Sequence, residues 1–522
     1  MNKIIYSLFL LIIFSSLTNK AFSQPLKLEN VGSENVYFTY HNKPLLSFGS
    51  MSDFIFYASE DAYNYKLWAD WQSAHGMNHC RAYIPGSWKH IEKFAKENDG
   101  SLNNILFPYK EFEPGSRIFD LTQFDERYWK RFREQCEYLQ SKEIIIDLLM
   151  LNGWQFFNYN KEVASYNWDG HFFNPQNNIN KCTELLNSTV NDENRLNFYH
   201  SFSDGNIDLF EIQKKYYEKV IEVTHDLDNI YYELVHELGM NYGEWEKVAV
   251  WLEEIAKIVR KKWKEYNPDR KIILATDGGH LRGFPFNQSG GFPQENSEMD
   301  WIFSRQYFDV IISGNHHHTG NIREWTKKYK KPYIAQESND NGQRWTYRRP
   351  ETRTHLRKYV WKLMMAKCQQ IDIYSKPITS LPYIEDLKGP QHNYDPNNWN
   401  KFENDALILR QFFDNIIDYG NLKFQGYFFI ASTGHNMVLS SPKEIIAYIS
   451  SPTGLENIVY PAPRGAMVWL YDLLFEEGEY KAQFFDPKSG PTKSKIITIK
   501  DGTTIFRTPE FVDDFVVHIV HI

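Results

Sequence analysis

Short apolar runs alternate with amphipathic segments along most of the chain, from about residue 45 to residue 418. The apolar runs carry few polar residues, which is typical of parallel strands that are covered on both faces. The segment 245–266 shows the other period, because its apolar residues recur at steps of three and four with charged residues between them. That spacing predicts a helix with one buried face. The predicted strands are 44–49, 79–84, 144–151, 230–235, 271–276, 308–313, 332–336 and 371–374.

Helical patterns separate these strands, and they predict an α/β fold. Eight strands with helices between them favour a closed (β/α)8 TIM barrel. An open, doubly wound sheet is the structural alternative, but no glycine-rich phosphate loop follows an early strand. The predicted helices include 65–75, 126–141, 209–225, 245–266, 322–330, 354–369 and 405–418.

The pattern changes near residue 421, where short alternating runs replace the longer helical segments. Turn sequences such as 487–490 (Pro-Lys-Ser-Gly) and 501–502 (Asp-Gly) separate several of these runs. This is typical of a small antiparallel β-sandwich. We therefore predict a barrel over 24–420 and a C-terminal β-sandwich over 421–522.

The first 23 residues resemble a secretory signal peptide. A short basic start at Lys3 precedes an apolar run, and Ala21-Phe22-Ser23 fits a small-x-small cleavage site. The run is too short for a convincing membrane span. No cysteine at the junction could accept a lipid. These features predict a secreted or periplasmic protein that is cleaved after Ser23, with no membrane span.

Composition narrows the choice of partners. The 522 residues carry a formal net charge of −8, so no overall basic field favours nucleic acid as a partner. Aromatic residues make up 16% of the chain, and flat apolar faces with polar edges suit sugar rings, although most should fill cores. The four cysteines lack metal-type spacing, and Cys80, Cys136 and Cys368 are expected to be buried thiols. An exported protein could form a disulfide, but the sequence does not pair them.

Two glutamates stand at the ends of predicted strands about a hundred residues apart. Glu237 follows the fourth strand and Glu337 follows the seventh. In a barrel of parallel strands, the C-terminal ends of all strands surround one mouth, so both carboxyl groups can meet there. Breaking a glycosidic bond needs such a pair, one group protonated and the other ionised. The alternative for either glutamate is a solvated or ion-paired carboxylate at a strand end.

The barrel resembles the clan A retaining glycoside hydrolases. In that clan the fourth strand commonly ends Asn-Glu with the glutamate as acid/base, and the seventh ends with the nucleophile. The resemblance implies Glu237 as acid/base and Glu337 as nucleophile. His236 stands where the asparagine that binds the sugar 2-hydroxyl is usual, and a histidine could also donate a hydrogen bond there, although the resemblance then leaves the sugar preference open. Segment 76–81 (Gly-Met-Asn-His-Cys-Arg) is similar to the clan's second-strand motif, which implies that Arg81 lies beside the nucleophile and keeps it ionised.

Further residues are candidates for substrate contact. His316 or His317, at the end of the sixth strand, resembles a substrate-contacting position of the clan, whereas a metal site in 316–318 would need a sharp turn. Trp154, Trp168 and Trp345 lie in loops expected at the mouth, where they could stack on sugars. Weaker candidates are Asp277 and His280 after the fifth strand and Asp147, which we expect to be paired in the barrel interior.

The C-terminal part adds a second resemblance. Segment 478–490 (Gly-Glu-Tyr-Lys-Ala-Gln-Phe-Phe-Asp-Pro-Lys-Ser-Gly) is similar to the collagen-binding-type sandwich that follows apiosidase-like barrels in polysaccharide-degrading bacteria. Segment 42–49 resembles the opening strand of such barrels. Together they favour an apiosidase-like relative, with a sandwich that supports the barrel.

The sequence thus predicts an exported retaining glycoside hydrolase that acts on a carbohydrate, either a complex polysaccharide or its oligosaccharides. No cofactor and no metal is expected, because protonation and covalent attack suffice. Two alternatives stay open: a non-catalytic carbohydrate-binding protein on the same scaffold, and a metal-dependent hydrolase that uses the cluster His316–His318.

Overall fold

The computed structural model describes residues 24–31, 35–50, 55–57, 64–97, 101–156, 167–187, 193–236, 238, 244–277, 298–314, 319–336, 351–373, 396–424, 429–431, 435–450, 461–462, 464–471, 476–500 and 502–522. Within them lie two four-stranded parallel sheets, and each of the eight predicted strands overlaps one of their strands. The first sheet has the order β10 (Leu274–Ala275), β9 (Ile230–Glu233), β8 (Ile145–Leu149), β5 (His79–Tyr83). The second has the order β11 (Ile311–Gly314), β12 (Tyr333–Gln336), β13 (Gln370–Ile373), β4 (Ser47–Ser50).

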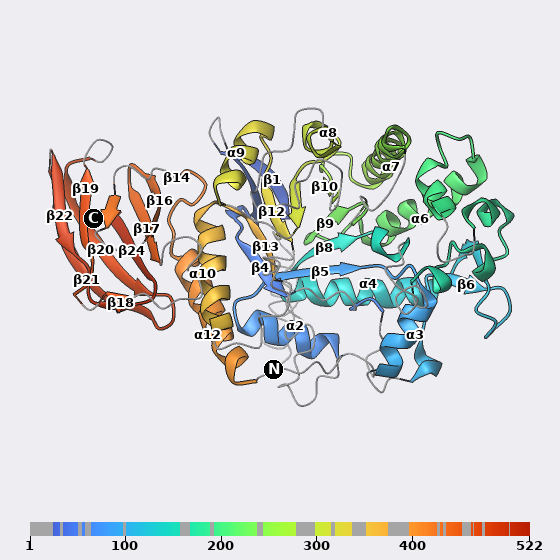
Figure 1. Ribbon diagram of the computed structural model, residues 1–522, viewed down its shortest axis with the longest axis horizontal. Helices are drawn as coiled ribbons and strands as arrows, with labels where there is room; N and C mark the ends of the chain where they lie inside the picture. The colour runs from blue at the N-terminus through green and yellow to red at the C-terminus, as the bar shows by residue number, and fades with distance from the viewer. Residues whose placement is uncertain are drawn as a thin grey trace, which may run out of the picture.

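Backbone hydrogen bonds join the two sheets at both of their junctions. The amide of Asn78 donates to the Phe48 carbonyl at 3.0 Å, beside β4 and β5, and the amide of Asp309 donates to the Leu274 carbonyl at 2.7 Å, beside β10 and β11. The eight strands therefore follow one another in the order expected of a (β/α)8 barrel. Figure 1 shows helices on both sides of these strands, with α7, α8 and α9 on one side and α2 and α4 on the other.

The helices follow the apolar periodicity of the sequence. In α4 the buried residues Tyr128, Trp129, Phe132, Cys136 and Leu139 recur at helical spacing. The Asp125 side chain caps this helix by accepting a hydrogen bond from a backbone N–H of its first turn. The helices are α2 (Tyr65–Ala74), α3 (Trp88–Glu97), α4 (Glu126–Ser141), α6 (Ile207–Thr224), α7 (Trp245–Tyr266), α8 (Glu298–Ser304), α9 (Thr319–Tyr329), α10 (Glu351–Met365) and α12 (Pro396–Asp414).

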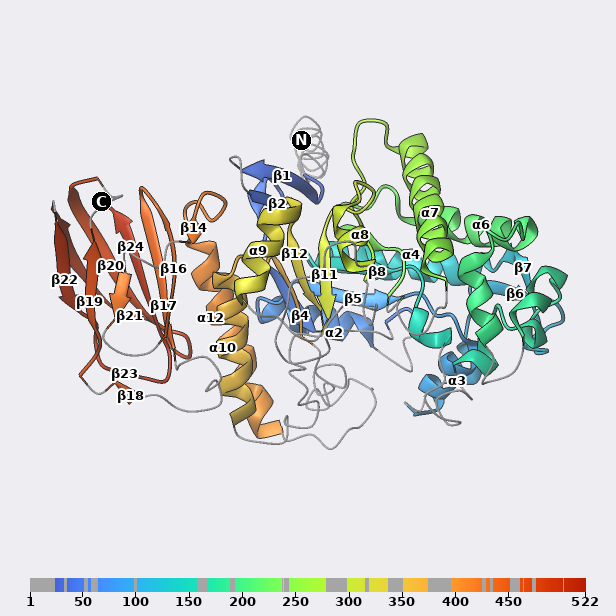
Figure 2. The ribbon, with the colours of Figure 1, turned by 45° about the horizontal axis from the view of Figure 1, so that its top comes forward.

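A small N-terminal sheet covers one end of the barrel. It consists of β1 (Lys27–Val31), β2 (Asn35–Tyr40) and β3 (Lys43–Pro44). Its apolar side chains share a buried cluster with residues at or near the start of several barrel strands, such as Ile145 of β8 and Ile312 of β11. Figure 2 shows β1 and β2 at the starting end of β11. The opposite end, where the strands finish, is therefore the one that carries the candidate site.

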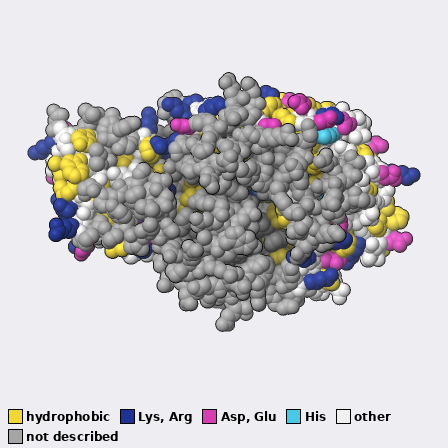
Figure 3. Space-filling view, viewed as in Figure 1, with side chains coloured by type: hydrophobic (Ala, Val, Ile, Leu, Met, Phe, Trp, Pro, Cys, Tyr) yellow, Lys and Arg dark blue, Asp and Glu magenta, His cyan; other side chains and the backbone are white. Residues whose placement is uncertain are grey.

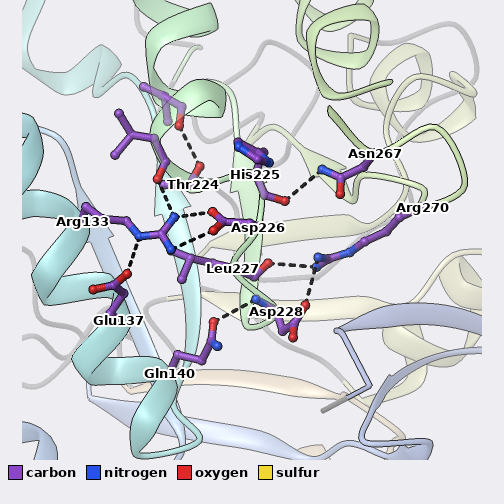
Figure 4. Close-up of polar contacts among 12 residues, drawn as sticks. Arg133, Glu137, Gln140, Thr224, His225, Asp226, Leu227, Asp228, Asn267 and Arg270 are labelled. Atoms are coloured by element: carbon purple, nitrogen blue, oxygen red, sulfur yellow. Dashed lines mark hydrogen bonds and ion pairs between the residues drawn. The ribbon is translucent and has the colours of Figure 1, made fainter. Parts of the chain in front are cut away.

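Ion pairs hold the turn that leads into β9. Figure 4 shows Arg133 of α4 paired with Asp226, while Arg270 pairs with Asp228 through Nη1 and Oδ1 at 3.1 Å. The Gln140 side chain accepts a hydrogen bond from the Asp228 amide at 2.9 Å. Exposed ion pairs contribute little to stability on their own. Here they connect α4, the turn and the start of β10, which sets the position of β9.

The C-terminal residues form antiparallel sheets. A six-stranded sheet has the order β14-β16-β17-β24-β20-β21, and a three-stranded sheet has the order β15-β19-β22. The two sheets share a hydrophobic cluster, to which Val468 and Phe506 of the small sheet and Ala447 and Val517 of the large sheet belong. The strands are β14 (Lys423–Phe424), β15 (Phe429–Ala431), β16 (His435–Ser441), β17 (Glu444–Ser450), β18 (Pro461–Ala462), β19 (Met467–Tyr471), β20 (Gly478–Asp486), β21 (Gly490–Ile499), β22 (Thr503–Arg507), β23 (Phe511–Val512) and β24 (Phe515–His521).

The surface of these C-terminal sheets keeps several large apolar side chains exposed. Tyr471, Ile496 and Ile505 all belong to this group. In Figure 3 hydrophobic side chains lie beside Lys and Arg at the end of the molecule that β19, β21 and β22 form in Figure 1. Single exposed apolar residues are normal on sheets, so this patch by itself assigns no partner.

A buried charged cluster connects the C-terminal sheets to the barrel helix α10. Arg357 is 2% exposed and contacts both Asp513 and Asp514, with Nη2 and the Asp514 Oδ1 2.9 Å apart. The neighbouring Lys358 also pairs with Asp513. Tyr448 of β17 donates a hydrogen bond to Asp514 at 2.9 Å. The C-terminal sheets are thus attached to helix α10 through buried opposite charges.

Two remaining expectations concern cysteines and the membrane. None of the four cysteines forms a disulfide, and Cys80, Cys136 and Cys368 are buried, as predicted. Cys182 is only partly buried. Among the described residues, no helix combines the length and the apolar character needed to span a membrane.

Candidate active site

Polar side chains fill the barrel interior near the ends of β8, β9 and β12. Gln336 is the last residue of β12, and its Nε2 donates to Glu233 Oε2 at 2.6 Å and to Asp147 Oδ2 at 3.1 Å. Glu233 is the last residue of β9, and Asp147 lies in the middle of β8. All three side chains are fully buried. One amide therefore joins three strands, two of which are separated by about a hundred residues in sequence.

The surroundings of Asp147 disfavour its charged form. Burial raises its pKa well above the ordinary value, and the nearby charge of Glu233 raises it further. The expected pairing of Asp147 in the barrel interior is confirmed, because Gln336 donates to it. The side chain alternates with apolar neighbours along β8, which is the sequence signal of an inward-facing polar residue.

Arg81 occupies the centre of this interior. It is 1% exposed, so the alternative of a surface arginine is wrong. Its Nη2 lies 2.7 Å from Nδ1 and 2.9 Å from Nε2 of His236, and its Nη1 lies 3.5 Å from Asp372 Oδ2 on β13. Arg81 and Asp147 are direct neighbours in the β5–β8 register. The Arg81 guanidinium therefore connects the two four-stranded sheets, since β5 belongs to the first and β13 to the second.

His236 follows β9 and contacts two carboxylates. Its Nδ1 lies 3.0 Å from Asp277 Oδ2 and 3.3 Å from Glu233 Oε1. Burial and Arg81 both act to lower the pKa of His236, but hydrogen bonds to Asp277 and Glu233 outweigh them and raise it well above the usual value. The backbone is fixed too, because its amide donates to Leu151 at 2.9 Å. The His236 ring is therefore held between two carboxyl groups and the Arg81 guanidinium.

The same three side chains have to be considered as a metal site. Glu233, His236 and Asp277 each offer one ligand atom, and these atoms lie within 4.8 Å of one another. A metal would need an unprotonated ring nitrogen of His236. The Arg81 guanidinium approaches both ring nitrogens, and its positive charge would repel a bound metal ion. The arrangement fits a network of ion pairs better than a metal centre.

A second histidine lies deeper in the barrel. His79 is completely buried, and burial together with the charge of Arg81 lowers its pKa to about 3. Its Nδ1 lies 2.7 Å from the amide nitrogen of Gln370, so Nδ1 accepts and the ring is neutral. His79 is therefore a neutral hydrogen-bond acceptor within the barrel.

Of the three candidate tryptophans, Trp154 and Trp168 lie in the described part of the chain, and their side chains differ in exposure. Trp154 follows β8 and is only partly buried, and its ring lies 6.2 Å from the His90 ring. The loop that carries it is bonded to β9, since the Gly153 amide donates to the His236 carbonyl at 2.8 Å. Trp154 thus stands next to the candidate site and retains an exposed surface.

Trp168 has a different environment. Its indole is fully buried, packs against Phe156 and His171, and donates to the Asn187 carbonyl at 3.1 Å. A side chain with no exposed face cannot stack on a sugar, so the structure assigns Trp168 to the packing of the long loop after β8. Residues 167–187 of that loop form short 3₁₀ turns.

Several predicted site residues lie outside the described part of the chain. These are Glu237, Glu337, His280, His316, His317 and Trp345. Sequence reasoning did not select Glu233, Gln336 or Asp372, all of which belong to the buried network. Part of their signal was available, because Glu233 and Gln336 each end an otherwise apolar strand, whereas Asp372 shares its strand with Gln370.

Comparison with known proteins gives a fold but no family. No protein-family model matches the sequence, and no curated protein does. A solved glycoside hydrolase aligns over 95% of this chain and 97% of its own, with a TM-score of 0.57 and 11% identity. A glycoside hydrolase family 5 protein from Bacteroides vulgatus ATCC 8482 aligns over 95% and 94%, with a TM-score of 0.55 and 11% identity. At this identity the likeness establishes a shared fold, in which a (β/α)8 barrel is expected.

Proposed function

We propose that this protein is an exported retaining glycoside hydrolase, with Glu237 as acid/base and Glu337 as nucleophile. The observation that carries the proposal is the hydrogen bond between Gln336 and Glu233 across the barrel interior. Glu337 is the next residue after Gln336, and Glu237 is the next after His236, which also contacts Glu233. Each glutamate is therefore tethered within ~3.8 Å, Cα to Cα, of a residue in one buried network.

The chemistry needs the two carboxyl groups in different protonation states. In the proposed mechanism Glu237 protonates the leaving oxygen, while Glu337 attacks the anomeric carbon and forms a covalent intermediate. Glu237 then removes a proton from the water that releases the sugar. Retention requires the carboxyl groups about 5–5.5 Å apart. Arg81 supports the ionised state of Glu337, because a buried cation near a carboxylate favours its charged form.

The fold likeness to two solved glycoside hydrolases supports this choice of reaction class. The substrate proposed is a complex polysaccharide or its oligosaccharides, and the partly exposed Trp154 is a candidate platform for a sugar ring. The C-terminal sheets, which share one core, are proposed to form the β-sandwich of an apiosidase-like relative. Export would remove residues 1–23, so the mature protein should begin at Gln24, which N-terminal sequencing of the exported protein would test.

The decisive experiment replaces each glutamate by its amide. A glycan library is screened for hydrolysis, and the parent is compared with Glu237→Gln, Glu337→Gln and the control Glu265→Gln, an exposed residue near the far end of α7. Each of the first two variants should lose activity by at least about 10²-fold, whereas the control keeps it. Near-normal turnover of either variant removes that residue from its role.

Two further measurements separate the mechanism from its alternatives. A fluorinated sugar that traps the covalent intermediate should label Glu337, and proton NMR should detect a first product with retained anomeric configuration. Binding without hydrolysis of any glycan would favour a carbohydrate-binding protein instead. Loss of activity with a chelator would favour the metal-dependent alternative.

A further inference from the structure

The backbone around Trp154 is anchored beside the polar interior of the barrel. The Trp154 amide donates to the Asn152 side-chain oxygen at 3.1 Å. The Gly153 amide donates to the His236 carbonyl at 2.8 Å, and the turn Gly153–Phe156 is a short 3₁₀ helix. These bonds fix where the Trp154 side chain starts, but they do not fix how its indole is oriented.

The next residue, Gln155, connects this turn to the loop after β5. Its side chain is completely buried. Its Oε1 accepts a hydrogen bond from the Gly86 amide at 3.0 Å, and its Nε2 donates to the Tyr57 hydroxyl at 2.8 Å. A Cβ on Gly86 would lie only 2.3 Å from this Oε1, so the contact requires a glycine at that position. Both ends of one buried amide are therefore bonded to segments that are distant in sequence.

His90 of α3 lies between Gln155 and Trp154. Its Nδ1 is 3.3 Å from Gln155 Nε2, and its ring lies 6.2 Å from the Trp154 ring. Burial lowers the pKa of His90 to about 3, so the ring is neutral and its Nδ1 can accept from Gln155. The Tyr57 ring packs edge-on against His90 at 5.2 Å. Gln155 thus holds the two side chains, His90 and Tyr57, that pack next to the indole.

We propose that Gln155 is a positioning residue that holds the Trp154 indole in one orientation as a stacking platform for a neutral sugar ring. This inference rests on the proposed function, and it deepens it. A side chain that must be immobilised when the ligand binds lowers affinity by about 2- to 10-fold, and an indole that is already held avoids this loss. The described side chains that contact Trp154 are Asn152 and His90, and neither carries a charge. A neutral oligosaccharide is therefore the expected ligand, because its apolar ring face suits an aromatic surface.

A double-mutant cycle measured by binding tests the idea. Dissociation constants for cellohexaose, mannohexaose and xylohexaose are determined by calorimetry for the parent, Gln155→Met, Trp154→Ala and the double variant. If Gln155 acts through Trp154, Gln155→Met weakens binding of the preferred sugar about 3-fold or more in the parent and less than about 1.5-fold in the Trp154→Ala background. Equal losses in both backgrounds, no loss in the parent, or a parent that binds none of these sugars would overturn the proposal.

The matched control is Gln369→Met. Gln369 is another buried glutamine, and its side chain bonds to the Phe38 amide and the Val36 carbonyl at the opposite end of the barrel. Loss of these bonds should lower stability and leave sugar affinity unchanged, so an equal loss of affinity in the control would also refute the role of Gln155. If Gln155→Met fails to fold, Tyr57→Phe removes one acceptor of Gln155 Nε2 and supplies the same comparison.

A second readout needs no sugar. The parent labelled with fluorotryptophan is compared with Gln155→Met by ¹⁹F NMR, and the Trp154 signal is identified by its loss in Trp154→Ala. Gln155→Met should shift or split this signal, because the indole is no longer held in one environment. An unchanged signal would refute the positioning role. If the parent binds a sugar but hydrolyses none, the proposed function fails, and the binding cycle and the NMR comparison still decide whether Gln155 positions Trp154.

Discussion

Acid should weaken this protein through buried histidines, and His171 allows the effect to be isolated. The His171 side chain is 1% exposed, and burial lowers its pKa to about 3. The Phe173 amide donates to Nδ1 at 3.2 Å, so the neutral ring carries its proton on Nε2. Within the described residues, Nε2 has no hydrogen-bond partner. Burial disfavours the charged ring, and a second proton on Nδ1 would also have to replace this hydrogen bond.

The size of the effect follows from the two pKa values. The folded pKa of about 3 lies below the unfolded value of about 6.5, so the unfolded chain takes up the proton first. Stability contributed by His171 is complete above pH 6.5 and is lost as the pH falls toward 3. At pH 5 the loss is about 2 kcal/mol, and it depends little on the folded pKa as long as that stays below 4. His79 and His90, with pKa values of about 3, add losses of the same sign.

The assay compares His171→Gln with the parent by urea unfolding at pH 7 and pH 5. Glutamine does not titrate, so the difference in unfolding free energy between the two pH values should shrink by about 2 kcal/mol in the variant. The matched control is Asn177→Ala, which removes amide hydrogen bonds to the Asp169 and His171 carbonyls. That variant should be weaker by a similar amount at both pH values. An unchanged pH dependence in His171→Gln would refute the reasoning.

Three further predictions concern the scaffold and the site. Arg357→Met leaves Asp513 and Asp514 buried without their main cation. The unfolding free energy measured by urea titration should therefore fall by about 3–5 kcal/mol. An unchanged urea midpoint would contradict this prediction. Gly465→Ala, at φ 66° with its new Cβ only 2.2 Å from a backbone oxygen, should cost at least about 1–2 kcal/mol by the same assay. Trp154→Ala should raise KM about 5-fold with little change in kcat if its ring stacks on sugar, and an unaltered KM would remove it from the site.

Apolar runs were enough to locate the barrel strands, because strands covered on both faces must be apolar. The ranges 79–84 and 332–336 contain β5 and β12. The same patterns identified α4 and α7 to the residue. Arg81 was placed at a strand on the strength of a local motif, and its burial agrees with that placement.

Contacts across the barrel could not be predicted in the same way. The bond between Gln336 and Glu233 depends on the register of strands that are distant in sequence, and no local pattern reports that register. Burial of Trp168 was missed for a related reason. A loop without a repeating period gives no indication of which aromatic residues turn inward, so only the folded loop distinguishes Trp168 from Trp154.

The buried charged cluster between α10 and the C-terminal sheets has a consequence for truncated forms of this protein. A protein that stops at residue 420 would retain Arg357 and Lys358 but lose Asp513 and Asp514, which neutralise them. Two cations built for an enclosed environment would then face water beside the newly uncovered Trp361 ring, which normally stacks on Tyr448. An uncovered apolar surface of this kind promotes aggregation, so the barrel and the C-terminal sheets are best produced as one chain.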